Sequence, residues 1–374
     1  MCPVGSPVLE EVPGQDSAIA FLIQAAQRPH HAYVLAGPEG SGKSLAARAL
    51  AAALLCSEGG CGSCRACRLA LEDHHPNEFI VEPEGRDIHV DTVREEVWHP
   101  AYRTAPEPGR KVFVIREADR LSPAAADTLL KVLEEPPADA VLILLSARAH
   151  ELPDTVLSRC HVVTFSALAE SFVVGSLTGE GVEPTRARLA ARLTGGNLGR
   201  ARRLAKDPKG LAFREAAQEA VTLAARGPAG ALAAAEVVLE AAKVYRAGLK
   251  DELGAELAPF LDERGRPEEA YRGAIRRIEV RHKRRERRSE RDYVDWVLLA
   301  VSSLLRDRIA SAVGGGADVL LNPDLAPDDS LGVPRAAAGL SGVEAARAVL
   351  AEDFNLNTRL LLEQAFLRLG ELAA

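Results

Sequence analysis

One octapeptide constrains what this chain can fold into more than any other feature. Residues 37–44 read Gly-Pro-Glu-Gly-Ser-Gly-Lys-Ser and fit the pattern G-x-x-x-x-G-K-[ST]. They follow an apolar run at 31–37 that is expected to be a buried strand. They open an Ala- and Leu-rich stretch at 44–55 that is expected to be a helix. This order predicts a phosphate-binding loop, and the alternative is a glycine-rich turn without a ligand.

The residue types in this loop suit the chemistry of a phosphate chain. Glycines let backbone N–H groups surround the phosphates, and the start of the following helix adds a favourable dipole. The lysine is expected to reach the terminal phosphates and the serine to hold Mg²⁺. The candidate nucleotide-binding residues of the loop are Gly37, Gly40, Gly42, Lys43 and Ser44.

Further apolar runs predict the rest of a sheet. Helical segments separate these runs, a pattern typical of a parallel sheet that is covered on both faces. They lie at 78–83, 111–119, 140–147 and 160–165. After about residue 166 the strands stop and helices are expected, first three short ones and then long amphipathic ones. The short ones are predicted at 168–178, 184–193 and 197–206, and a loop-like interruption at 314–334.

Composition excludes several classes of protein. No stretch of about 18 uncharged apolar residues occurs, so no membrane span is expected. The start of the chain has neither a basic segment nor an apolar core, so no signal peptide is expected and a cytoplasmic location is predicted. The net charge of −7 disfavours a strong DNA binder, and an aromatic content of 4% disfavours a stacking platform for single strands.

Four of the six cysteines lie within twelve residues, in the spacing C-x4-C-x2-C-x2-C. Four thiolates at this spacing suit tetrahedral Zn²⁺ and leave no open coordination position for chemistry. Without an export signal, metal ligation is favoured over disulfide bonds. A structural zinc site is therefore predicted, and the alternative is four reduced thiols without a metal. The ligands would be Cys56, Cys61, Cys64 and Cys67.

The strand at 111–119 ends in an unusual way for an ATPase. A P-loop ATPase normally places a carboxylate there to organise Mg²⁺, and in many families an adjacent Glu orients the attacking water. Here Arg116 stands at the metal-organising position and Glu117 at the water-orienting position. Because a guanidinium repels Mg²⁺, a nucleotide-binding fold with impaired hydrolysis is predicted, unless Asp119 or Glu117 replaces the missing Asp.

Together with further motifs, these residues resemble the clamp-loader subunits of bacterial DNA polymerase III, which are AAA+ proteins. The motifs are Val12-Pro13-Gly14-Gln15, His30-His31-Ala32-Tyr33, the four-cysteine module, Leu133-Glu134-Glu135-Pro136-Pro137, Ser158-Arg159-Cys160 and Phe354-Asn355-Leu356-Asn357. The fold class implied is an α/β AAA+ P-loop domain with a parallel sheet, then a small helical lid and an all-α collar. The implied domains are 1–166 with the zinc module at 56–67, 167–208, and 209–374.

The resemblance also implies roles for single residues. Gln15 lies in the motif on the adenine side of the nucleotide, and Ser146 lies near the first sensor position. The arginine of Ser-Arg-Cys, Arg159, would be presented to the ATP site of a neighbouring subunit. A sensing arginine of the motor subunits falls on Gly199 here, and Arg200 comes one place late.

Departures from the motor subunits favour the stationary, delta-prime type of subunit, because the motor subunits read Asp-Glu where this chain reads Arg116-Glu117. That type implies a non-motor subunit that helps load the sliding clamp onto primed DNA and supplies Arg159 as a finger, with weak or absent ATPase of its own. The implied partners are the gamma/tau and delta subunits and, through the complex, the clamp and primed DNA. Structural Zn²⁺ is the implied cofactor, and ATP with Mg²⁺ is left open.

Two other functions fit part of the sequence. An ATP-hydrolysing gamma-type motor subunit is disfavoured by Arg116, and an unrelated AAA+ remodelling enzyme is disfavoured by the combination of motifs. The arginine-rich run at 276–291 would suit DNA. Its Glu279, Glu286 and Glu290 favour instead a solvated helix face with ion pairs along the helix.

Overall fold

The computed structural model describes residues 6–83, 87–206, 212–257, 272–316, 319–322, 324–325, 331–352 and 356–370. Its contacts divide the chain into two compact units. The first consists of Met1–Ser176 and Thr194–Arg200, and the second of Leu177–Leu193 and Ala201–Ala374. The boundaries at 166 and 208 that the resemblance implies stay predictions.

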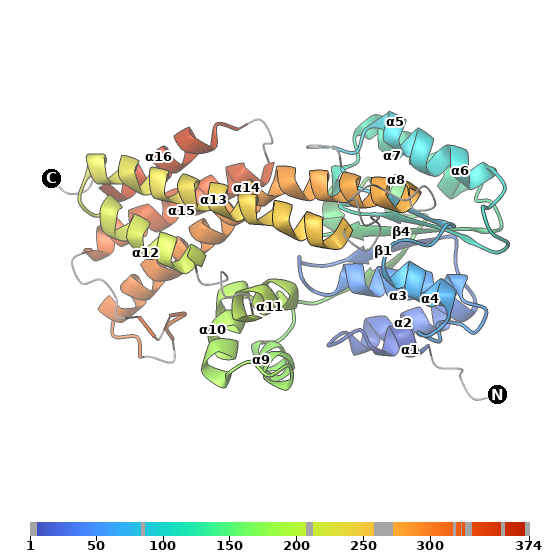
Figure 1. Ribbon diagram of the computed structural model, residues 1–374, viewed down its shortest axis with the longest axis horizontal. Helices are drawn as coiled ribbons and strands as arrows, with labels where there is room; N and C mark the ends of the chain where they lie inside the picture. Colours follow the sequence, from blue (N-terminus) through green and yellow to red (C-terminus); the bar gives the residue numbers. More distant parts are fainter. Residues whose placement is uncertain are drawn as a thin grey trace. The chain divides into compact units, whose positions relative to one another are not determined.

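The first unit contains a five-stranded parallel sheet in the order β2-β3-β4-β1-β5 (Figure 1). The strands are β1 (Ala32–Ala36), β2 (Glu78–Val81), β3 (Lys111–Ile115), β4 (Ala140–Ser146) and β5 (His161–Thr164). All five predicted strands are therefore confirmed. The strand expected at 111–119 ends early, because Glu117 adopts a left-handed φ of 51° and begins a 3-10 turn at Ala118–Arg120.

Helices cover both faces of this sheet (Figure 1). Successive side chains of a strand point to opposite faces, so Tyr33 and Leu35 of β1 pack into one core while Ala32 and Val34 pack into the other. One face carries α1 (Pro7–Glu10), α2 (Asp16–Gln27), α3 (Lys43–Leu55) and α4 (Arg65–Leu71). The other carries α5 (Val90–Val93), η1 (Arg94–Trp98), α6 (His99–Tyr102), α7 (Pro123–Glu134) and α8 (Asp154–Leu157).

The three predicted short helices are confirmed as α9 (Glu170–Gly179), α10 (Pro184–Thr194) and α11 (Leu198–Lys206). The long helices that follow surround the core of the second unit, which is built largely from alanine, valine and leucine with Phe366. They are α12 (Ala212–Ala224), α13 (Pro228–Leu257), α14 (Arg272–Ala312), α15 (Val333–Glu352) and α16 (Thr358–Gly370). The predicted fold class, a parallel α/β sheet followed by helical regions, is therefore confirmed.

Two sequence predictions fall partly outside the described residues. The arginine-rich run at 276–291 lies in α14, and most of its side chains are outside the described part of the chain. The same holds for Phe354 and Asn355 of the last motif. Among the described helices, none combines the length and the apolar character that a membrane span needs.

Candidate nucleotide and metal sites

The phosphate loop joins β1 directly to α3. Gly40 and Gly42 have φ values of 76° and 97°, a left-handed backbone that glycine adopts without steric cost. Gly37 has no room for a side chain, because a Cβ there would lie 2.1 Å from the carbonyl oxygen of Phe165. The backbone path of the loop is therefore open only to glycine at these positions, and it fits the cradle that a phosphate chain requires.

Lys43, the first residue of α3, lies buried within this loop. Its Nζ donates to the carbonyl oxygens of Gly37 and Pro38, the latter at 2.7 Å. Burial lowers the pKa of Lys43, while the carboxylates of Glu39 and Asp119 act in the opposite direction. The structure thus brings the lysine and glycines predicted from the pattern together at the start of α3, with Ser44 in the same first turn.

Gln15 fastens the loop to the segment that follows β5. Its buried amide donates through Nε2 to the carbonyl oxygens of Ser41 at 3.0 Å and Ser166 at 2.7 Å, and Oε1 accepts from the backbone N–H of Ser166 at 3.2 Å. These bonds give Gln15 a positioning role that the sequence did not reveal. Its role toward adenine stays a prediction.

A second segment meets the tip of the loop. Asn197 packs so closely on Gly40 that a Cβ at Gly40 would lie 1.9 Å from its Cγ. The Asn197 side chain also caps α11 by accepting from the backbone N–H of Arg200 at 3.0 Å, and the Arg200 guanidinium lies 3.3 Å from a carboxylate oxygen of Glu39. Although Arg200 comes one place late in the sequence motif, it therefore reaches the phosphate loop.

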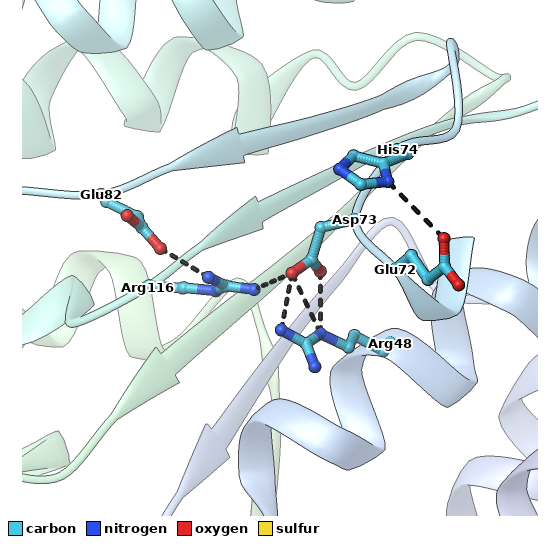
Figure 2. A network of polar contacts seen from close by, with 6 residues as sticks. All are labelled: Arg48, Glu72, Asp73, His74, Glu82 and Arg116. Carbon is cyan, nitrogen blue, oxygen red and sulfur yellow. Dashed lines mark hydrogen bonds and ion pairs between the residues drawn. The ribbon is translucent and has the colours of Figure 1, made fainter. Parts of the chain in front are cut away.

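Arg116 belongs to a chain of ion pairs between β3, β2 and α3 (Figure 2). Its guanidinium donates to Glu82 and, at 2.7 Å, to Asp73, which also accepts from Arg48 of α3 at 2.7 Å. Burial raises the pKa of Asp73, but Arg116 and Arg48 together outweigh it and hold the pKa below its usual range. Arg116 therefore neutralises carboxylates beside the sheet.

Glu78, the first residue of β2, is buried beside this network. Neither of its carboxylate oxygens has a hydrogen-bond partner among the described residues. Burial, and after it the charge of Asp73, raises the pKa of Glu78 to about 8. The carboxyl group is therefore protonated at neutral pH, a state that no sequence pattern around it indicates.

We expect Glu78→Gln to flatten the pH dependence of stability. The folded pKa lies above the ordinary value of 4.5, so the contribution of Glu78 is fully present below pH 4.5 and is lost as the pH rises towards 8. The slope is about 1.4 kcal/mol per pH unit. Glutamine cannot ionise. The unfolding temperature of the variant should therefore rise relative to that of the wild type at pH 8–9, and the two temperatures should be more alike at pH 5.

Glu82→Gln is the matched control, because it removes a charged partner of Arg116 from the same network. This variant should lower the unfolding temperature and should not reproduce the gain at high pH. Equal slopes for Glu78→Gln and wild type between pH 5 and 9 would show that Glu78 is ionised in the fold.

The two acidic residues that follow Arg116, Glu117 and Asp119, place their carboxylates differently. Glu117 has a left-handed φ, and its carboxylate pairs with Arg120 at 2.9 Å. Asp119 is nearly inaccessible and accepts from the hydroxyl of Ser146, at the end of β4, at 2.8 Å. The structure therefore joins the predicted sensor Ser146 to Asp119, while the catalytic role expected of Glu117 stays a prediction.

Arg159 lies in the turn between α8 and β5. Its Nη1 donates to the carbonyl oxygen of Thr155 at 2.9 Å and to the hydroxyl of Ser158 at 3.3 Å, and its Nη2 pairs with Glu134 at 2.8 Å. The structure thus joins two motifs that are separate in the sequence. The Arg159 side chain remains 36% exposed and that of Glu134 51% exposed, so both are accessible to a partner.

The four clustered cysteines converge on one point. Their Sγ atoms all lie within 4.8 Å of one another, with separations of 3.8 Å between Cys56 and Cys61, 3.6 Å between Cys56 and Cys64, and 4.0 Å between Cys61 and Cys67. A regular tetrahedron of sulfurs about 2.3 Å from a zinc ion has edges of about 3.8 Å. The predicted ligand set therefore has the geometry that Zn²⁺ requires.

Backbone amides surround these sulfurs. The N–H of Glu58 donates to Cys56 at 3.3 Å, and the N–H of Cys67 donates to Cys64, the N-cap of α4, at 3.4 Å. Hydrogen bonds from the backbone of Cys64 and Ser63 lower the pKa of Cys61 to about 6. Such bonds favour the thiolate at Cys61, which is the form that binds a metal, whereas burial raises the pKa of Cys67.

Residues 14–169 match the protein family described as "DNA polymerase III, delta subunit". The DNA polymerase III subunit delta' of Bacillus subtilis (strain 168) is 36% identical over 173 residues, which cover 45% of this chain and 51% of that protein. The subunit delta' of Pseudomonas aeruginosa is 44% identical over 136 residues, 35% of this chain and 41% of that protein.

A relative with another subunit name matches at lower identity. The DNA polymerase III subunit tau of Bacillus subtilis (strain 168) is 31% identical over 175 residues, 45% of this chain and 31% of that protein. The chain spans about half or less of the length of each of these relatives. The matched region, 14–169, contains the phosphate loop, the cysteine cluster and Arg159.

Proposed function

We propose that this chain, whose residues 14–169 are of the delta-prime type of DNA polymerase III subunit, acts in a clamp loader during DNA replication. The resemblance predicted from the sequence is confirmed by the family match and by relatives that are 36% and 44% identical. This match is the observation that carries the proposal. The partners proposed are the gamma/tau and delta subunits and, through the complex, the sliding clamp and primed DNA.

Within the complex the chain is proposed to be a stationary subunit. Arg116 occupies the place where an ATPase normally presents a metal-organising carboxylate, and its charge is balanced by Asp73 and Glu82. The glycine path of the loop and the buried Lys43 support nucleotide binding. When bound, Mg²⁺ would neutralise charge on the phosphates. Binding with weak turnover is therefore the expected behaviour.

Arg159 is proposed to act as an arginine finger on the ATP of a neighbouring subunit. Its three contacts, to Thr155, Ser158 and Glu134, fix the direction of the guanidinium while leaving it exposed. An exposed ion pair is worth at most about 1 kcal/mol, so a phosphate group can replace Glu134 at little cost. These features support a finger offered across an interface.

A gamma-type motor subunit remains the second candidate, and one observation favours it. Asp119 places a buried carboxylate against Ser146 at the end of β4, so the site does not lack acidic groups. Appreciable ATP turnover would need such a group near the phosphates.

The test is reconstitution with the gamma/tau and delta subunits, the sliding clamp and primed DNA from the same organism. Clamp loading should depend on this chain, and the chain alone should turn over ATP far more slowly than the assembled loader. A loader that assembles and works equally well without it would reject the clamp-loader role. Fast turnover by the isolated chain, abolished by Lys43→Ala, would identify a motor subunit instead.

A further inference from the structure

Ser146 links the phosphate loop to Asp119. β4 lies between β3 and β1 in the sheet, and Ser146, its last residue, is in register with Ala36 just before the loop. The backbone carbonyl of Ser146 accepts from the N–H of Gly37 at 3.1 Å. Its hydroxyl donates to Asp119 Oδ1 at 2.8 Å. One residue thus fixes the first glycine of the loop and a carboxylate together.

The two oxygens of Asp119 differ in how firmly they are bound. Oδ1 accepts from Ser146 and, at 3.3 Å, from the N–H of Ala147. Oδ2 has a contact of 3.4 Å with Arg148, whose guanidinium lies closer to Glu151, at 2.8 Å. The Asp119 side chain is only 5% exposed. The carboxylate is therefore held by one oxygen, while the contact that the described residues make with the other oxygen is long and comes from the exposed side chain of Arg148.

The residues that would ordinarily supply this charge are engaged elsewhere. Arg116 is bound to Asp73 and Glu82, and the Glu117 carboxylate pairs with Arg120 from a left-handed backbone. Asp119 is instead close enough to Lys43 for its charge to favour the protonated lysine. Among these three positions after β3, Asp119 is the one whose carboxylate is joined to the phosphate loop.

We propose that Asp119, fixed by Ser146, is the carboxylate on which Mg²⁺ binding with a nucleoside triphosphate depends in this chain. The inference rests on the nucleotide binding in the proposed function. Mg²⁺ prefers oxygen ligands and is usually held by one or two carboxylates together with phosphates and water. Asp119 supplies such a carboxylate next to the phosphate loop. It lies three residues beyond position 116, where the sequence pattern of an ATPase expects the metal-organising carboxylate.

The test measures binding of a fluorescent ATP analogue to the isolated full chain, in excess Mg²⁺ and in EDTA. Wild type should bind the analogue more tightly with Mg²⁺ than in EDTA. In Asp119→Asn the ratio of these two affinities should be about tenfold smaller than in wild type. The affinity of Asp119→Asn in EDTA should not fall, because the amide removes a negative charge near the phosphates. Ser146→Ala, which keeps the carboxylate but frees it, should lose part of the gain.

Two further variants sharpen the result. Asp154→Asn, at the start of α8, is the control and should keep the Mg²⁺-dependent gain, whereas Glu117→Gln tests the rival carboxylate that follows β3. A full gain in Asp119→Asn, a loss in Glu117→Gln instead, or no Mg²⁺ dependence in wild type would each overturn the assignment. If thermal unfolding shows that Asp119→Asn does not fold, Ser146→Ala decides. An unchanged Mg²⁺-dependent gain in affinity in that variant rejects the proposal.

This measurement needs no partner subunit. A chain that shows the Asp119 effect but fails to support clamp loading would reject the proposed function and leave this inference standing. The opposite result would reject the inference alone.

Discussion

Arg159→Ala should lower the ATPase of the assembled clamp loader while leaving this chain folded and able to join the complex. Phosphoryl transfer builds up charge on the γ-phosphate, and a finger supplied by a neighbour can be worth about 10³ or more in rate. Only the interface served by Arg159 would fail, so the total rate should fall partially. The measurement is DNA- and clamp-stimulated ATPase together with clamp loading.

Two variants control for other effects. Arg110→Ala removes an exposed arginine that precedes β3 in the same unit and should leave the rate unchanged. Glu134→Gln removes the ion-pair partner of Arg159 and should change the rate far less than Arg159→Ala. Normal rates for Arg159→Ala in a complex of normal composition would show that Ser-Arg-Cys is an inert surface feature here.

The second large effect concerns zinc. We expect protein purified without chelators to contain one zinc per chain, and Cys67→Ser to abolish most of it. Loss of a structural metal is among the few changes that cost more than about 4 kcal/mol, which for a unit of this size lowers the unfolding temperature by about 10 °C. Elemental analysis and thermal unfolding are the measurements.

Cys160→Ser is the matched control, because Cys160 lies outside the cluster. It should retain the metal and change the unfolding temperature much less. Purified wild type with far less than one zinc per chain, or a Cys67→Ser variant as stable as wild type, would contradict the assignment of a structural site.

Local patterns were sufficient to predict much of the fold. Apolar runs located all five strands, and the glycine spacing located the loop and placed the start of α3 within one residue of Lys43. The cysteine spacing predicted a cluster whose four sulfurs do converge. In each case the relevant residues are near one another in the sequence, so that short-range geometry determines the result.

The partners of the site residues were not predictable in this way. Arg116 is joined to Asp73 across 43 positions, and Gln15 to Ser166 across 151. Such contacts depend on which strands are neighbours, and no local sequence pattern predicts the strand order β2-β3-β4-β1-β5. The early end of β3 at Ile115 arose from a left-handed residue, Glu117, that is not a glycine, so no turn signal marked it.

α3 connects the two sites that the sequence singled out. It begins with Lys43 in the phosphate loop and is capped at its other end by Cys56, a predicted zinc ligand. Thirteen residues of helix form a rod of about 20 Å, and its middle is tied to Asp73 through Arg48. Metal at the cysteines and nucleotide at the phosphate loop would therefore bind at the two ends of one helix. If zinc changes the nucleotide affinity, the coupling must be reciprocal, and nucleotide affinity measured with and without zinc tests this.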